Sequence, residues 1–188
     1  AQSLVEGTSL DFIEANHFTM QYSSYPFGPI VYPWGFPALL APFYAVFGLN
    51  MIALKSVGVI TFLLFLILLW LGFRKYHSFV WLLSLICLFA LNPTLLMLMN
   101  EILSDIPFLL FSTASVMLIG RFIIEKRRLI SPVVDNALLG VSMAAAFFIR
   151  TNGILLPITL GMTQCIVLAQ RLWQRKPAQD NWSSILKQ

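Results

Sequence analysis

Long apolar runs that are almost free of charge set the strongest limit on how this chain can fold. The run Met51–Phe73 holds one charged residue, Lys55, and is followed by Arg74-Lys75. Its length suits a helix that crosses a lipid bilayer, which needs about 20 apolar residues. Charged residues make up 11% of the chain, against roughly 25% in soluble domains. We therefore expect an all-α, polytopic transmembrane helical bundle.

Further apolar stretches follow the first run. They are Phe79–Leu91 with its continuation Thr94–Met99, then Ile106–Ile124, Val133–Ile149 and Ile154–Leu168. Asn92-Pro93 interrupts the first of these stretches. Together with Met51–Phe73 they predict a transmembrane bundle of about five crossings within residues 50–176. Asn50 is a suitable N-cap for the first crossing.

Basic residues fall in alternate connections between these runs. They are Arg74-Lys75, then Arg121 and Lys126–Arg128, then Arg171, Arg175 and Lys176. By the positive-inside rule these connections are cytoplasmic, and residues 177–188 then form a cytoplasmic segment. Residues 1–34 and 100–105 are then on the outer face. The net charge of +4 does not indicate nucleic-acid binding, because the basic residues form no single face.

The stretch 35–49 is apolar but is broken by Pro37, Pro42 and Gly48. If it crossed the membrane, Arg74-Lys75 would lie outside, against the charge rule. We therefore expect an interfacial or re-entrant helix at the outer face. Residues 1–34 before it are predicted to form an outer-face loop. Aromatic residues gather at the end of that loop, as is typical of a membrane–water interface.

Two carboxylates, Glu101 and Asp105, lie between long apolar runs in the stretch Asn92–Pro107. Their spacing puts both on one face if the segment is helical. Ionisable residues beside membrane segments are costly and are therefore candidates for function. Paired carboxylates hold a metal, accept a proton or bind sugar hydroxyls. Two structural alternatives stay open: Asp105 fits an N-cap or a charge on the helix dipole, and Glu101 fits a solvated side chain.

Two cations, Lys55 and Arg150, fall near the outer ends of crossings, against the general charge bias. Both fit partners for a lipid phosphate, or side chains that snorkel to the interface. The residues Thr151–Gly153 after Arg150 predict a tight turn with free backbone N–H groups. Tyr32 and Trp34 fit either a substrate cleft in which a sugar stacks on them, or the beginning of the interfacial helix.

Several short motifs occur in a familiar order. They are Tyr32–Pro37 (YPWGFP), where Gly35 is expected to let the backbone turn, Asn92-Pro93, Leu103–Pro107 (LSDIP) and Phe147–Pro157 (FFIRTNGILLP). In this order the chain resembles the membrane glycosyltransferases of the GT-C class. In particular, it resembles the bacterial relatives of dolichyl-phosphate-mannose–protein mannosyltransferases and aminoarabinose transferases. Trp34 departs from the proline often found at its position in that family.

The resemblance implies a polyprenyl-phosphate-linked sugar as donor and a glycan, lipid or protein as acceptor. Transfer would occur on the outer face of a bacterial inner membrane. Asp105 matches the second acidic loop residue of the family, and Arg150 matches its arginine after the short crossing. The resemblance also implies a main catalytic Asp upstream of Ala1, so we expect a piece of a longer enzyme. Whether the enzyme also uses a divalent metal ion as a cofactor is left open.

Two alternatives to an enzyme remain. In a non-enzymatic transporter or flippase segment, ionisable residues would line a path through the bundle. In this sequence they gather at the ends of the crossings, which favours a site that faces the membrane surface. The other alternative is a membrane scaffold without a site, in which neutral replacement of these charges would be tolerated.

Overall fold

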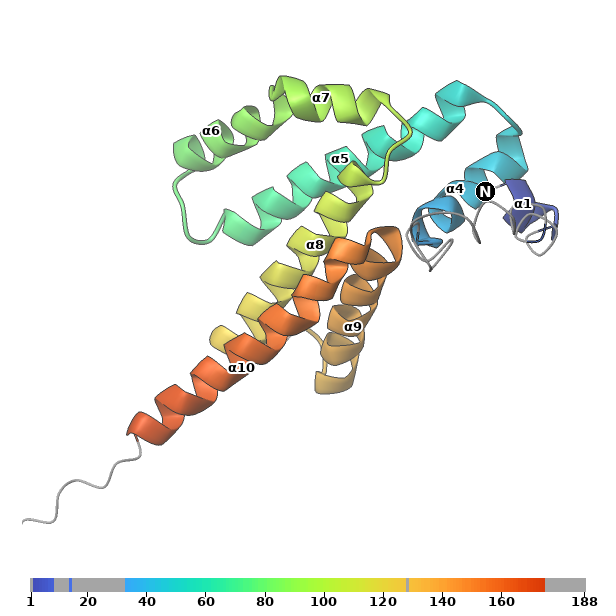
Figure 1. Ribbon diagram of the computed structural model, residues 1–188. Helices are drawn as coiled ribbons and strands as arrows, with labels where there is room; N and C mark the ends of the chain where they lie inside the picture. Colours follow the sequence, from blue (N-terminus) through green and yellow to red (C-terminus); the bar gives the residue numbers. More distant parts are fainter. Residues whose placement is uncertain (1, 9–13, 15–32, 128, 175–188) are drawn as a thin grey trace, which may run out of the picture.

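The computed structural model describes residues 2–8, 14, 33–127 and 129–174, and every regular element in this part of the chain is helical. The elements (Figure 1) are α1 (Gln2–Val5), α4 (Gly35–Phe47), α5 (Met51–Phe73), α6 (Phe79–Ala90), α7 (Pro93–Asn100), α8 (Asp105–Ile119), the π-helix η2 (Gly120–Ile124), α9 (Pro132–Ile149), the 3₁₀-helix η3 (Thr151–Ile154) and α10 (Leu155–Gln174). The predicted all-α class is confirmed. In the described chain, four helices are long and apolar enough to cross a membrane, and α6 with α7 would make a fifth span. These helices indicate a membrane protein.

Asparagine side chains begin two of the helices. Asn50 accepts hydrogen bonds from the backbone N–H groups of Ile52 (3.0 Å) and Ala53 (3.3 Å) at the start of α5, which confirms the predicted cap. Asn92 caps α7 in the same way. Pro93 takes the first helical position, where no N–H is needed. The chain bends by 52° between α6 and α7, so the predicted interruption is also confirmed.

Helix α8 lies between the two halves of the bundle and belongs to both of its hydrophobic clusters. The first cluster is Phe62, Phe65, Leu69 and Ile106, and the second is Ile119, Leu139, Met143, Ala146 and Leu156. Ser115 of α8 and Ser142 of α9 add a buried hydrogen bond of 3.0 Å between these helices. Bonds of this kind in membrane bundles contribute about 0.6 kcal/mol on average.

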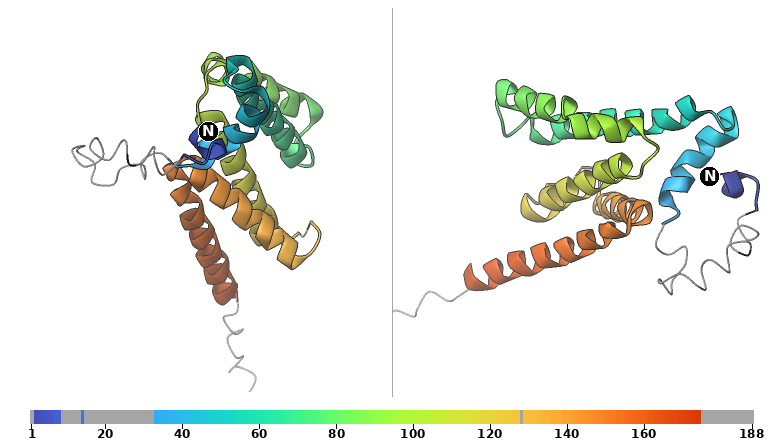
Figure 2. Two further views of the ribbon diagram at one scale, coloured as in Figure 1. Left: turned by 90° about the vertical axis from the view of Figure 1, so that its right-hand side faces the viewer. Right: turned by 45° about the horizontal axis from the view of Figure 1, so that its top comes forward.

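Helix α4 is shorter than the spans. Its 13 residues extend over about 20 Å, whereas the hydrocarbon core of a bilayer is about 30 Å thick. Its C-cap is Gly48, whose φ of +62° lies in the left-handed region that glycine adopts readily. The helix packs on α1, α5 and α9 (Figure 2). A helix is therefore present where 35–49 was expected to form one, while its position at the interface stays a prediction.

The surfaces of the spans are apolar and exposed. Ile52 and Val80, for example, are 81% and 71% exposed, and only 11% of an 18-residue window of the span Thr151–Trp173 is buried inside the protein. An apolar surface this large requires lipid or another helix to cover it. The residues outside the described part include Tyr32, most of the predicted loop 1–34 and all of 177–188. Predictions about them stay predictions.

Candidate functional site

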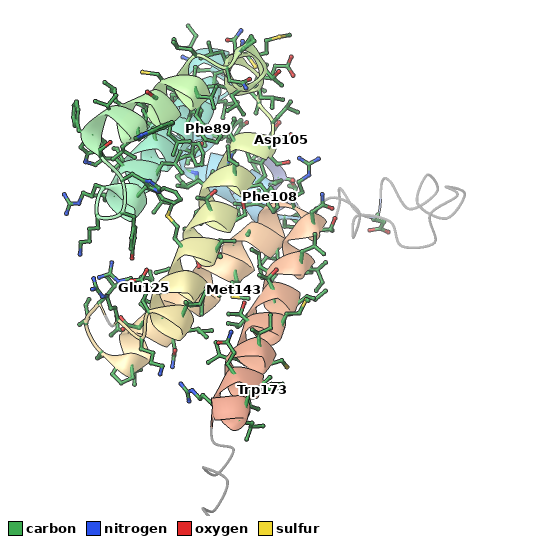
Figure 3. All side chains as sticks on the ribbon, turned by 90° about the vertical axis from the view of Figure 1, so that its left-hand side faces the viewer. Phe89, Asp105, Phe108, Glu125, Met143 and Trp173 are labelled. Carbon is green, nitrogen blue, oxygen red and sulfur yellow. The ribbon has the colours of Figure 1, made fainter. Side chains whose placement is uncertain are left out.

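The connections between the candidate spans lie at two ends of the bundle. Figure 3 labels Asp105 and Glu125 at opposite ends of α8 and η2. The Asp105 end also holds the beginning of α5, the last turn of α7 and the junction of α9 with α10. We call the opposite end, where α5 ends and η2 meets the loop before α9, the Glu125 end. By the positive-inside rule, the Asp105 end is predicted to face outward.

Asp105 is the first residue of α8. The N-cap position belongs to Ser104, whose side chain makes no capping hydrogen bond, so the expected N-cap at Asp105 is wrong. The alternative, a negative charge in the first turn of the helix, is what the structure has. Pro107 follows within the same turn, where its missing N–H leaves no hydrogen bond unmade. The local sequence therefore starts a helix with a carboxylate at its positive end.

Arg150 reaches this carboxylate from the end of α9. Its backbone is extended, with φ of −152° and ψ of 132°, between the last helical residue Ile149 and the helix η3. The Nη1 group of Arg150 donates a hydrogen bond to Oδ1 of Asp105, and the two form an ion pair. The side chains are 40% and 34% exposed, respectively. The two side chains are therefore held together by their ion pair, and both remain accessible to a ligand at the Asp105 end of the bundle.

Two glycines bring the backbones at the Asp105 end into close contact. A Cβ added to Gly35, the first residue of α4, would lie 2.4 Å from the carbonyl carbon and oxygen of Phe148. A Cβ on Gly153 would lie 2.5 Å from Cα and N of Phe147. The expectation that Gly35 lets the backbone turn is therefore corrected. Its role is to let α4 touch the backbone of α9 two residues before Arg150.

Lys55 and Glu101 lie at the same end but outside this pair. The Nζ group of Lys55 lies 3.4 Å from Oδ1 of Asn100, to which it donates a hydrogen bond. Glu101 is exposed and has no ion pair with another described residue. Since α7 ends at Asn100 and α8 begins at Asp105, the condition for a shared helix face, a helical segment through both carboxylates, is not met. The alternative of a solvated Glu101 agrees with its exposure.

The remaining sequence candidates have mixed outcomes. Trp34 forms the turn before α4 and is 37% exposed, so its ring remains accessible, while Tyr32 lies outside the described residues. The tight turn after Arg150 is present as η3. However, the N–H of Gly153 donates to the carbonyl of Arg150 at 2.9 Å. It is therefore not one of the free donors that the sequence predicted.

An apolar groove lies among the helices η2, α9 and α10. It has a volume of about 730 Å³. Phe148 and Ile154 line it on either side of Arg150 in sequence, and Met143 and Phe122 also line it. Its walls are mostly hydrocarbon, which suits an apolar chain better than a polar molecule.

Sequence reasoning missed two polar contacts at the Glu125 end. Asp135 is 3% exposed and accepts hydrogen bonds from the N–H groups of Leu129 (3.0 Å) and Ile130 (3.2 Å). The Tyr76 hydroxyl donates to Glu125, and this hydrogen bond raises the pKa of the tyrosine above 10.0. A lone carboxylate inside an apolar run was the available signal for Asp135. No pattern in the sequence marks the partner of Tyr76.

The described residues contain no group of three or more His, Cys, Asp or Glu side chains that could hold a metal ion. The fold and the site define a class: a polytopic helical membrane protein with an ion pair between the termini of two spans. Comparisons with protein-family models, with curated proteins and with solved structures find no match to this chain.

Proposed function

We propose that this chain is part of a membrane glycosyltransferase that uses a polyprenyl-phosphate-linked sugar as donor. The observation that carries the proposal is the ion pair between Asp105 and Arg150. Close to Arg150 in the sequence, Phe148 and Ile154 line an apolar groove. Arg150 is the cation for the donor phosphate, and Asp105 holds its guanidinium in place. The apolar groove would take the first units of the polyprenyl chain. The type of reaction, glycosyl transfer, is inferred from the resemblance of the motifs to the GT-C class.

In the proposed reaction, an acceptor hydroxyl attacks the anomeric carbon of the donor sugar. A carbon–oxygen bond forms there, and the bond to the lipid phosphate breaks with its electron pair on the phosphate. Arg150 stabilises the charge that develops on this leaving group, assisted by Lys55 from α5. The proton of the hydroxyl passes to a carboxylate, which the resemblance expects in a segment before Ala1. Trp34 and Glu101 are the described residues at this end that would contact the sugars.

The alternative of a transporter segment has no specific support in the described residues. The charged side chains of the long helices lie in their terminal turns: Lys55 in α5, Asp105 and Arg121 in α8 and η2, Asp135 in α9, and Arg171 in α10. A path for charged substrates across the membrane would need ionisable groups in the middle of the spans, whereas the polar groups described there include the hydroxyls of Ser115 and Ser142. A site at one end of the bundle suits surface chemistry.

The test uses membranes that contain the protein as its gene encodes it. Donors with mannose or aminoarabinose on polyprenyl phosphate are supplied, and the release of polyprenyl phosphate is measured. Asp105→Asn and Arg150→Ala are expected to lower release by at least about 100-fold, the size expected for lost transition-state stabilisation, at unchanged expression. Arg171→Ala, at the other end of the bundle, is the matched control and retains activity. Normal release in both site variants would refute these roles.

A further inference from the structure

At the Glu125 end, two connections that are far apart in the sequence meet through side chains. Tyr76 follows α5 and donates its hydroxyl hydrogen bond to Glu125, which follows η2. The last turns of α5 and α8 are also close there, because a Cβ added to Gly72 would lie 2.7 Å from Sδ of Met117. The contact therefore brings the connection after α5 close to the connection after η2.

These connections concentrate positive charge. The described cations are Arg74, Lys75, Arg121, Lys126 and Arg127, and Glu125 is the carboxylate among them. Glu125 already accepts from Tyr76, and its Oε2 lies 3.9 Å from Nε of Arg127. Asp135, the next carboxylate along the chain, accepts from two backbone N–H groups. The carboxylates that the structure places here therefore leave most of the positive charge without a partner.

Arg121 provides the second, independent observation. Its Nε atom is buried and has no hydrogen-bond partner, although a buried donor without an acceptor is costly. The helix around it is widened into a π-turn, in which the N–H of Glu125 donates to the carbonyl of Gly120 at 3.0 Å. Turns of this kind are frequent at functional sites. The buried Nε–H of Arg121 therefore has no acceptor among the described residues.

We propose that the Glu125 end binds the phosphate group of an anionic membrane lipid, with Arg121 and Arg127 as its ligands. The planar guanidinium fork matches the oxygens of a phosphate. Apolar surface for the lipid tails is available close by in the sequence, since Ile124 is 65% exposed and Ile130 is 79% exposed. A lipid supplies both the phosphate oxygens and the apolar tails. Basic pockets between transmembrane helices bind anionic headgroups. This site is separate from the Asp105 end and does not depend on the proposed transferase activity.

The experiment measures thermal unfolding of the purified full-length protein in a neutral detergent. Phosphatidylglycerol is titrated in, and phosphatidylcholine serves as the zwitterionic comparison. Phosphatidylglycerol is expected to raise the unfolding temperature of the wild type and of the Arg171→Gln control. Arg121→Gln and Arg127→Gln should each bind phosphatidylglycerol about fivefold more weakly, as expected for one lost basic contact with an anionic lipid. Arg127 is 63% exposed at its side chain, so its variant should fold even if Arg121→Gln does not.

Two further outcomes decide between a defined site and a diffuse charge effect. Arg121→Lys keeps the charge and removes the fork, so weaker binding in this variant supports the site. Equal losses in Arg121→Gln and Arg171→Gln, or an Arg121→Lys variant that matches the wild type, would overturn it. Inorganic phosphate is the third ligand. If it stabilises the wild type as well as phosphatidylglycerol does, the site belongs to free phosphate and the assignment to a lipid is wrong.

Discussion

The two ends of α8 are built differently, although each carries a contact between charged or polar side chains. At the Asp105 end, the ion pair with Arg150 sits beside two backbone contacts, at Gly35 and Gly153, that no side chain could occupy. At the Glu125 end, Tyr76 and Glu125 join the helices, and the nearest glycine contact, at Gly72, is with a methionine side chain. The first end is preorganised by backbone packing, whereas the second is joined by flexible groups.

The largest expected effect tests this contrast directly. In Gly35→Ala the new methyl group would meet the backbone of Phe148 at 2.4 Å, so α4 must move away from α9. We expect a loss of roughly 1–3 kcal/mol in the free energy of unfolding, as for other overpacked sites. Transfer activity should fall as well, because the backbone that precedes Arg150 moves. Unfolding in detergent, followed by intrinsic fluorescence, measures the first effect.

Gly72→Ala is the matched variant at the other end. Its methyl group would meet Sδ and Cε of Met117, a flexible side chain that can rotate away. Alanine also has a higher helix propensity than glycine by about 1 kcal/mol. We therefore expect little net change in stability. If Gly72→Ala and Gly35→Ala lose stability equally, the two ends are equally rigid and the comparison fails.

A smaller effect is expected from the ion pair at the Asp105 end. The side chains of Asp105 and Arg150 are 34% and 40% exposed, and pairs this accessible contribute up to about 1 kcal/mol. A double-mutant cycle with Asp105→Asn, Arg150→Gln and the double variant isolates this coupling from unfolding measurements. In these variants the transfer activity should fall by a larger free-energy equivalent than the free energy of unfolding does. A coupling of several kcal/mol would instead make the pair a structural element and weaken its proposed role in transfer.

The sequence predicts the spans better than it predicts the site. Length and apolar composition mark the spans, and Asn50 and Asn92-Pro93 mark where two helices begin, because these signals are local. The pairing of Asp105 with Arg150 spans 45 residues and depends on which helices become neighbours, so no local pattern reveals it. The resemblance places both residues in one family site, but it gives no contact between them. The contact of Gly35 with Phe148 also depends on which helices become neighbours, so the sequence does not predict it.

The expected shared face of Glu101 and Asp105 shows the limit of spacing arguments. A four-residue spacing implies a common face only within a continuous helix. Here the chain leaves α7 at Asn100 and starts α8 at Asp105. Ser104 and Asp105, ahead of Pro107, are residue types that favour a helix beginning. That signal was present in the sequence and supports a break more strongly than a continuous helix.

The smallest effect concerns the hydrogen bond at the Glu125 end and its dependence on pH. The hydrogen bond to Glu125 is the main cause of the raised pKa of Tyr76, while Arg121 and Arg127 act in the opposite direction. Because the folded pKa lies above the ordinary value of 10.0, the contribution of Tyr76 to stability is fully present below pH 10. It is lost as the pH rises through the folded pKa, since ionisation places two negative charges together.

The measurement compares the unfolding temperature of the wild type with that of Tyr76→Phe from neutral to alkaline pH. Lysines and other tyrosines titrate in both proteins, so their effects cancel in the difference. The wild type is expected to be more stable at neutral pH and to lose this advantage above pH 10. A constant difference across the range would mean that Tyr76 contributes only packing. The helices at the Glu125 end would then be held together by their apolar contacts.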